Sequence, residues 1–146
     1  MKRCAPVLIF GGALLLFVQD ALAHHSYAMF DHSRTVTIEG SVAKLEWVNP
    51  HVFVWMYVKN EKSGAYDLYG FENGPITMMM RAGWSSQTLK PGEKISVQFF
   101  PLTDGRTGGY FIKAVHADGS VAIGDTHAPG VQAELDKANP DKTAPH

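Results

Sequence analysis

Two adjacent histidines, His24 and His25, offer the clearest opportunity for metal chemistry in this sequence. They directly follow Ala23, the last residue of an Ala-Leu-Ala triplet of the kind that signal peptidases cut. After a cut there, His24 carries both an α-amine and an imidazole, and these two nitrogens close a chelate ring on one metal ion. A third nitrogen from another histidine completes a T-shaped site of the histidine-brace kind. Copper is the expected metal, because Cu(II) heads the divalent affinity order and prefers tetragonal geometry.

His25 adds a second binding mode. The α-amine, the ionised amide nitrogen of His25 and its imidazole bind Cu(II) in one plane. Both modes depend on cleavage between Ala23 and His24, since a cut one residue away removes the first mode and alters the second.

The third ligand of a folded site has to come from the body of the protein. Candidates are His51, which opens a predicted strand after Asn49-Pro50, and His116, which closes the last predicted strand. Proline stiffens the approach to His51 and so favours a fixed imidazole. His32, eight residues from the new terminus, is a looser option. The sequence leaves open whether any of them lies near His24.

Other interpretations of these residues need no metal. In these interpretations, a histidine beside the cleavage site has no function of its own, and His51 forms a hydrogen bond to the backbone at a strand end. His127 and His146 are then solvated residues of the tail. Met78 to Met80 are soft donors for Cu(I), but successive helical residues point about 100° apart, so core packing explains them better.

Residues 1–23 have the layout of a cleaved secretory signal peptide. Basic Lys2-Arg3 precede an apolar run from Ala5 to Val18, which is shorter than the roughly 20 residues that span a bilayer. The expected product is therefore periplasmic or secreted, with no stable membrane anchor after cleavage. Cleavage also removes Cys4, the only cysteine, so no disulfide is expected.

The rest of the chain predicts one domain, residues 24–123, built mainly of strands. β-Branched and aromatic runs alternate with turn signals, and Pro75 can begin a short helix. The order β-β-β-α-β-β predicts an all-β fold with one short helix, a small OB-like five-stranded barrel, and a small β-sandwich is the alternative. The predicted strands are 35–47, 51–58, 65–72, 94–101 and 109–116, and the helix is 76–82.

The first strand changes phase near a glycine. Val36, Ile38 and Val42 share one face of a regular strand, whereas Leu45 would fall on the opposite face. Such a slip beside Gly40 predicts a bulge or bend in one long strand.

Beyond Gly124 the sequence is rich in Pro, Asp, Lys and Ala, with few large apolar residues. We expect residues 124–146 to form a flexible tail, with at most a transient helical turn near Val131 to Ala138.

The charge balance excludes a nucleic acid partner. The chain has 13 basic and 14 acidic residues and a net charge of −1, whereas neutralising phosphates needs a basic face. No nucleophile elbow, cysteine nucleophile or HExxH helix is present, so a non-enzymatic protein is favoured. Copper-dependent oxidase-like chemistry at His24 is the main route by which it would be an enzyme.

Aromatic residues suggest an alternative function to copper binding. If Trp47, Trp55, Tyr57 or Tyr69 line an open barrel face, the protein is a metal-free interaction module of the cell envelope. Such a face would bind a partner protein or a small ligand.

Three segments resemble a known family: "HHSYAMFD", "TVTIEGSVAKLEWVNPH" and "RAGWSSQTLKPGEKISVQFFPLTDGRTGGYF". They are similar to an uncharacterised family of small exported bacterial proteins, catalogued as a domain of unknown function. The resemblance runs from His24 to about Gly119, and its most specific landmarks are the paired histidines, Asn49-Pro50-His51 and Gly83-Trp84. It implies an exported single domain and carries over no catalytic residue. It makes His24, His25 and His51 worth testing as one site.

Overall fold

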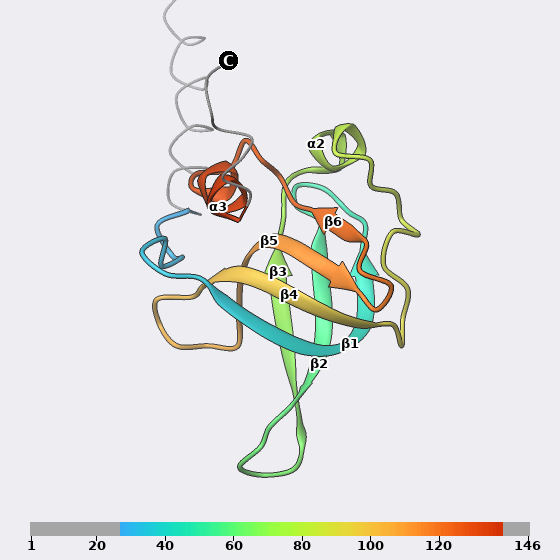
Figure 1. Cartoon of the computed structure of the whole chain (residues 1–146), viewed down its shortest axis with the longest axis vertical. Coiled ribbons are helices and arrows are strands. Elements are labelled where there is room, and N and C mark those ends of the chain that lie inside the picture. Colours follow the sequence, from blue (N-terminus) through green and yellow to red (C-terminus); the bar gives the residue numbers. More distant parts are fainter. Residues whose placement is uncertain (1–26, 139–146) are drawn as a thin grey trace, which may run out of the picture.

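One long, bent strand, β1 (Val36–Glu46), joins the two halves of the molecule (Figure 1). The computed structural model describes residues 27–138, so the predicted signal segment, His24, His25 and residues 139–146 lie outside the described part. The first half of β1 pairs with β4 and the second half pairs with β2, both antiparallel. Ser41 stands at the changeover, opposite both Tyr57 and Lys94.

The bend in β1 depends on Gly40, which has no side chain. A Cβ atom built on Gly40 would lie 2.4 Å from the carbonyl oxygen of Tyr57, far inside van der Waals contact. Two residues later the register with β2 shifts between Val42 and Lys44. The bulge predicted from the phase change beside Gly40 is therefore confirmed, and it lets one strand serve two neighbours.

The remaining strands close a barrel. Their order is β3-β2-β1-β4-β5, and a parallel pairing of β3 with β5 joins the two ends. This closed mixed barrel, with α2 between β3 and β4, confirms the predicted OB-like architecture, and the β-sandwich alternative is wrong. A sixth strand, absent from the prediction, pairs with β5 outside the barrel. The elements are β2 (Phe53–Lys59), β3 (Tyr66–Glu72), α2 (Ile76–Arg81), β4 (Lys94–Pro101), β5 (Gly108–His116), β6 (Val121–Ile123) and α3 (Val131–Lys137).

Two facing glycines allow the closure. Gly108 is paired with Gly70, and a Cβ on Gly108 would lie 2.1 Å from the carbonyl oxygen of Gly70. Gly108 also has φ of 126°, a region that side chains disfavour. We call the place where β3 and β5 meet the seam.

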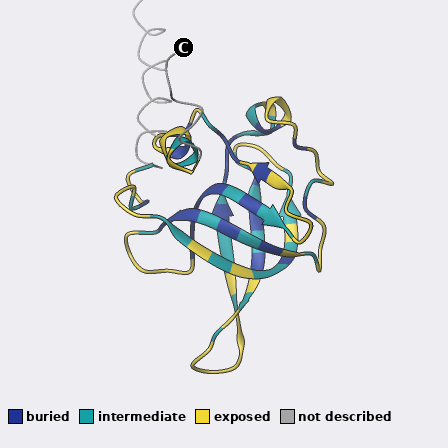
Figure 2. Cartoon of the chain, in the orientation of Figure 1, coloured by how far each residue is buried: buried dark blue, intermediate teal, exposed yellow. Residues whose placement is uncertain are grey.

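The barrel interior is filled by alternate residues of its strands, which Figure 2 shows as buried bands. Helix α2 and the segment after it close one end of the barrel with Met79, Trp84 and Leu89. The Trp84 indole N–H donates to the carbonyl of Ile123 at 2.6 Å, which ties this end to β6. Met79 is fully buried whereas Met80 is 62% exposed, so the consecutive methionines face different surroundings.

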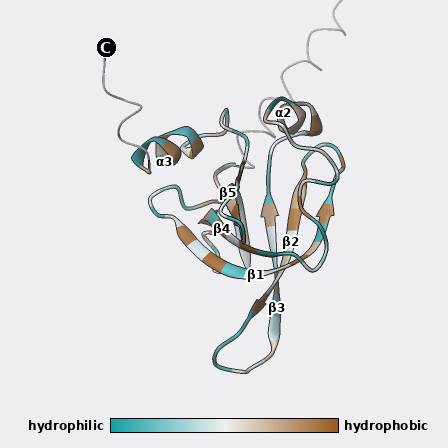
Figure 3. Ribbon diagram, turned by 45° about the vertical axis from the view of Figure 1, so that its right-hand side comes forward, coloured by the Kyte–Doolittle hydropathy of each residue, from teal (hydrophilic) through white to brown (hydrophobic). Residues whose placement is uncertain are grey.

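A second apolar cluster covers the outside of β4 and β5. Phe100 and Ile112 point away from the barrel interior and meet Ala128 and Val131. Residues 124–138 are thus not the flexible tail that the sequence predicted: α3 packs on this cluster, and Figure 3 shows it beside the barrel. Val131 and Leu135, one helical turn apart, supply the apolar side of α3. No helix between residues 27 and 138 combines the length and apolar character needed to cross a membrane.

A histidine–carboxylate pair ties the end of β5 to the turn before β4. The Nδ1 of His116 lies 2.5 Å from Oε1 of Glu93, and the backbone N–H of Lys90 donates to Oε2 at 3.0 Å. The bond from Lys90 above all, and that from His116, hold the pKa of the Glu93 carboxyl below its usual value, against the opposing effect of partial burial.

Gly40→Ala tests the bend. The added methyl group has to push β2 away from β1, so we expect the free energy of unfolding to fall by about 2–3 kcal/mol. The neighbouring exposed variant Glu39→Ala should stay within about 0.5 kcal/mol of the wild type. Urea unfolding of both variants measures the difference, and equal stabilities would show that Gly40 does not limit the approach of β2.

Glu93→Gln tests the tie at the end of β5. Because the pKa of Glu93 is lowered by folding, its contribution is present above the ordinary glutamate value of 4.5 and is lost as the pH falls through the folded value. Glu93→Gln should therefore cost about 1 kcal/mol near pH 7 and clearly less near about pH 3, because the stabilisation is lost as the pH falls through the lowered folded pKa. Urea unfolding at the two pH values measures this, with the exposed Glu61→Gln as control. A cost that does not change with pH would contradict the assignment.

Candidate functional site

His51 lies at the seam end of the barrel and is held by a carboxylate. It stands two residues before β2 and follows the cis peptide bond between Asn49 and Pro50. Its Nδ1 lies 2.8 Å from Oε1 of Glu72, the last residue of β3. The side chain of Glu72 is only 12% exposed, whereas that of His51 is 36% exposed. An Nδ1–H that donates to a carboxylate leaves Nε2 with the ring's free lone pair, which can accept a metal.

Two tyrosines lie beside Glu72. Tyr110 on β5 is the register partner of Glu72 across the seam, and paired residues of parallel strands point to the same side of the sheet. The Tyr110 ring packs 5.3 Å from the ring of Tyr27, and their hydroxyl oxygens are 3.4 Å apart. The beginning of the described chain is thereby held against the outside of the seam.

A second histidine–carboxylate pair comes from the segment after β6. Asp125 is buried, and its Oδ1 accepts from the backbone N–H of His127 at 2.9 Å and lies 3.3 Å from the Nδ1 of that residue. The backbone N–H of Asp125 donates to Oδ1 of Asn73, which is also fully buried. The Nδ2 of Asn73 has no hydrogen-bond partner within residues 27–138.

We call Tyr27, His51, Glu72, Tyr110, Asp125 and His127 the seam cluster. Its two carboxylates affect both phenols. Burial raises the pKa of Tyr27; the hydrogen bond to Tyr110 opposes this, and the charges of Asp125 and Glu72 add to it. The pKa of Tyr110 is raised far more, again chiefly by burial. The seam cluster therefore presents neutral phenols and carboxylate-bound imidazoles, an arrangement suited to accepting a cation.

The predicted metal ligands are only partly brought together. His24 and His25 precede the described residues. His116 lies six positions along β5 from Tyr110, or ~20 Å at the usual rise of a strand, so it does not share a site with His51. His32 lies nearer, with Nε2 3.2 Å from the carbonyl oxygen of Tyr27. Within residues 27–138 no three histidine, cysteine or acidic side chains are grouped closely enough to hold a metal.

The predicted aromatic face is divided between the two sides of the barrel wall. Trp47 and Tyr69 pack against the interior core. Trp55 lies outside, where its indole N–H donates to Glu46 at 2.7 Å, and Tyr57 is also outside and 49% exposed. These four residues therefore do not form one binding face.

Sequence reasoning missed most of the seam cluster. The sequence does not single out Glu72 and indicates that His127 is a tail residue, because their partners are distant in sequence or in a segment expected to be flexible. A usable signal did exist: Tyr27 lies two residues after the paired histidines, and an aromatic residue there is well placed to hold this part of the chain against the barrel.

No curated protein and no solved structure shows significant similarity to this chain. The family model described as a family of unknown function (DUF6152) matches residues 13–111, which is more than half of the chain. The match runs from before the paired histidines into β5 and includes His51 and Glu72. The chain, a small β-barrel with a histidine–carboxylate pair at its seam, therefore belongs to this family of unknown function.

Proposed function

We propose that the protein is exported, is cut after Ala23, and binds Cu(II) at the seam through its new N-terminus and His51. The observation that carries this proposal is the hydrogen bond between His51 and Glu72. A carboxylate on Nδ1 fixes the tautomer and the ring orientation, as in most histidines that bind metals through Nε2. The proposed role is copper handling or sensing in the bacterial envelope, and no catalytic step is assigned.

The position of Tyr27 supports the inclusion of His24. Three peptide units separate the two residues, so their Cα atoms are at most ~11 Å apart. Tyr27 lies against Tyr110, the seam partner of Glu72, and Glu72 in turn binds His51. We infer from these contacts that the α-amine and imidazole of His24 can reach Nε2 of His51.

The surroundings fit a divalent cation bound by neutral nitrogens. Cu(II) bound by the amine and two imidazoles keeps its two positive charges, which the nearby carboxylates of Glu72 and Asp125 offset. Both carboxylates are largely shielded from water, so their effect on a cation is stronger than that of surface groups. His127 lies against Asp125 and is not part of the proposed site. Residues 27–138 contain no cysteine, and their consecutive methionines face different surroundings, so nothing in this part of the chain favours the softer Cu(I).

Copper titration of protein that begins at His24 tests the proposal. Electron paramagnetic resonance should show one equivalent of Cu(II) bound by several nitrogens. His51→Ala should weaken binding at least about tenfold and change the nitrogen hyperfine pattern, and Glu72→Gln should weaken it about 10–100-fold by releasing the ring. One extra alanine placed before His24 should abolish the same spectrum, because it moves the α-amine.

His116→Ala is the matched control, since this imidazole also binds a carboxylate but lies at the other end of β5. It should leave the spectrum and the affinity unchanged. Mass spectrometry of the exported protein comes first: a mature chain starting at any residue other than His24 overturns the brace. An unchanged spectrum in His51→Ala reduces the site to a terminal chelate that does not involve the barrel.

A further inference from the structure

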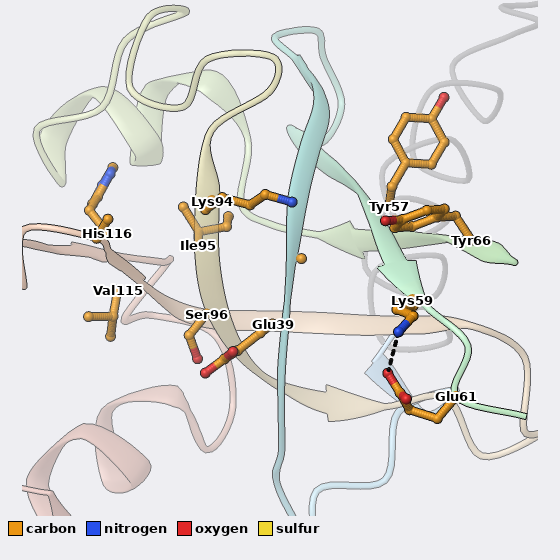
Figure 4. Close-up of a pocket in the computed structure, with 12 residues that line it drawn as sticks. Glu39, Tyr57, Lys59, Glu61, Tyr66, Lys94, Ile95, Ser96, Val115 and His116 are labelled. Carbon is orange, nitrogen blue, oxygen red and sulfur yellow. Dashed lines mark ion pairs between the residues drawn. The ribbon is translucent and has the colours of Figure 1, made fainter. Parts of the chain in front are cut away.

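A groove of about 700 Å³ lies on the outside of the barrel, at the other end of β3 from the seam (Figure 4). Its volume falls within the usual range for small-molecule sites, about 300–1,000 Å³. It is lined by residues of all five barrel strands. On β4 the lining residues Lys94 and Ser96 alternate with Ile95 and Val97, which are buried in the barrel core, so they point outward. We call it the tyrosine groove; the residues on which the argument rests are Glu39, Tyr57, Lys59, Tyr66, Lys94 and Ser96.

Two tyrosines form one wall of the tyrosine groove. Tyr57 and Tyr66 come from the paired strands β2 and β3, and their side chains lie close together in Figure 4. They are 49% and 63% exposed, so two large aromatic surfaces are kept in water. Within residues 27–138 neither hydroxyl makes a hydrogen bond, unlike those of Tyr27 and Tyr110. Exposed rings with unused hydroxyls are suited to stacking on a flat ligand that also offers hydrogen bonds.

Polar groups line the opposite wall. Glu39 on β1 stands opposite Ser96 on β4, and Lys94 precedes Ser96 by two residues, on the same face. Figure 4 shows the Lys94 amine directed towards the middle of the groove. In the described part of the chain Lys94 and Glu39 form no ion pair, so both an ammonium donor and a carboxylate acceptor are available.

The balance of charge determines the class of ligand. Lys59 pairs with Glu61 at 3.8 Å, and Lys94 is matched by Glu39, so the lining has no net charge. A polyanion such as a nucleic acid needs a basic channel, which this groove does not provide. Tyrosine rings together with separate donors and acceptors suit a neutral, hydroxyl-rich ligand with flat C–H faces. β-Linked pyranoses have this character, since their equatorial substituents leave both faces of each ring open.

We infer that the tyrosine groove binds a neutral, β-linked pyranose oligosaccharide. The sugar rings stack on Tyr57 and Tyr66, and hydroxyl groups bond to Lys94, Glu39 and Ser96. The placement agrees with the OB-type architecture, in which the face of the second and third strands is a common site for oligosaccharides. The inference does not depend on copper: Tyr66 and Glu72 are at opposite ends of β3, ~20 Å apart along the strand.

The test is a nuclear magnetic resonance titration of ¹⁵N-labelled, metal-free protein starting at His24. The probes are cellohexaose, xylohexaose and the β-1,4-linked N-acetylglucosamine hexamer, each up to millimolar concentration. At least one should shift the backbone amides of Glu39, Gly40, Tyr57, Tyr66 and Ser96, while amides of α3 and of the seam stay unchanged. Tyr57→Ala and Tyr66→Ala should each weaken binding about five- to tenfold.

Conservative and matched variants separate stacking from loss of fold. Tyr57→Phe keeps the ring and should bind within about twofold of the wild type. Lys94→Gln should weaken binding, whereas Lys62→Gln in the β2–β3 turn should not. Absence of shifts with all three oligosaccharides overturns the inference, as do shifts confined to residues outside the groove. Binding of a 12-nucleotide single-stranded DNA at these amides, in place of the sugars, overturns it in favour of a nucleic acid site.

Discussion

The fold depends on the ability of β1 to pair with two strands that do not pair with each other. An antiparallel partner on each half of one strand requires a sharp change of direction midway, and the close contact between Gly40 and the Tyr57 carbonyl provides it. The bulge after Val42 then resets the phase, so that apolar side chains face inward along both halves. Without the bend the sheet would stay open, and the apolar face that now fills the barrel would lie in water.

Closure of the barrel also places carboxylates in surroundings largely shielded from water. The contact between Gly70 and Gly108 brings strand ends from distant parts of the chain to one place, where carboxylates are held away from water. Shielded carboxylates are costly unless hydrogen bonds or positive charge compensate them. At the seam an imidazole lies against each of Glu72 and Asp125, and imidazole is the side chain whose charge changes most readily near neutral pH. The electrostatics of this place are therefore adjustable, whereas an arginine partner would have fixed them.

The barrel could be predicted from the sequence, whereas the arrangement of the candidate site could not, and the reasons are physical. Alternation of polar and apolar residues locates strands, and the change of phase beside Gly40 located the bulge, because both signals are local. The pairing of His51 with Glu72 depends on the register between β2 and β3, which side-chain type alone does not reveal. The sequence predicts only a transient turn where α3 forms, because Val131 and Leu135 are sparse in a polar segment. Their one-turn spacing suffices once an apolar surface is present to receive them.

The two-sided pairing of β1 also dictates an order of assembly. The β2–β3 hairpin joins residues close in sequence and can form early, whereas Val36 has to wait for Phe99. Until β4 arrives, the first half of β1 has an unsatisfied edge of backbone N–H and C=O groups. During folding this edge is open to pairing with another chain. The strand on which the finished barrel depends is thus also one that can aggregate while the barrel is incomplete.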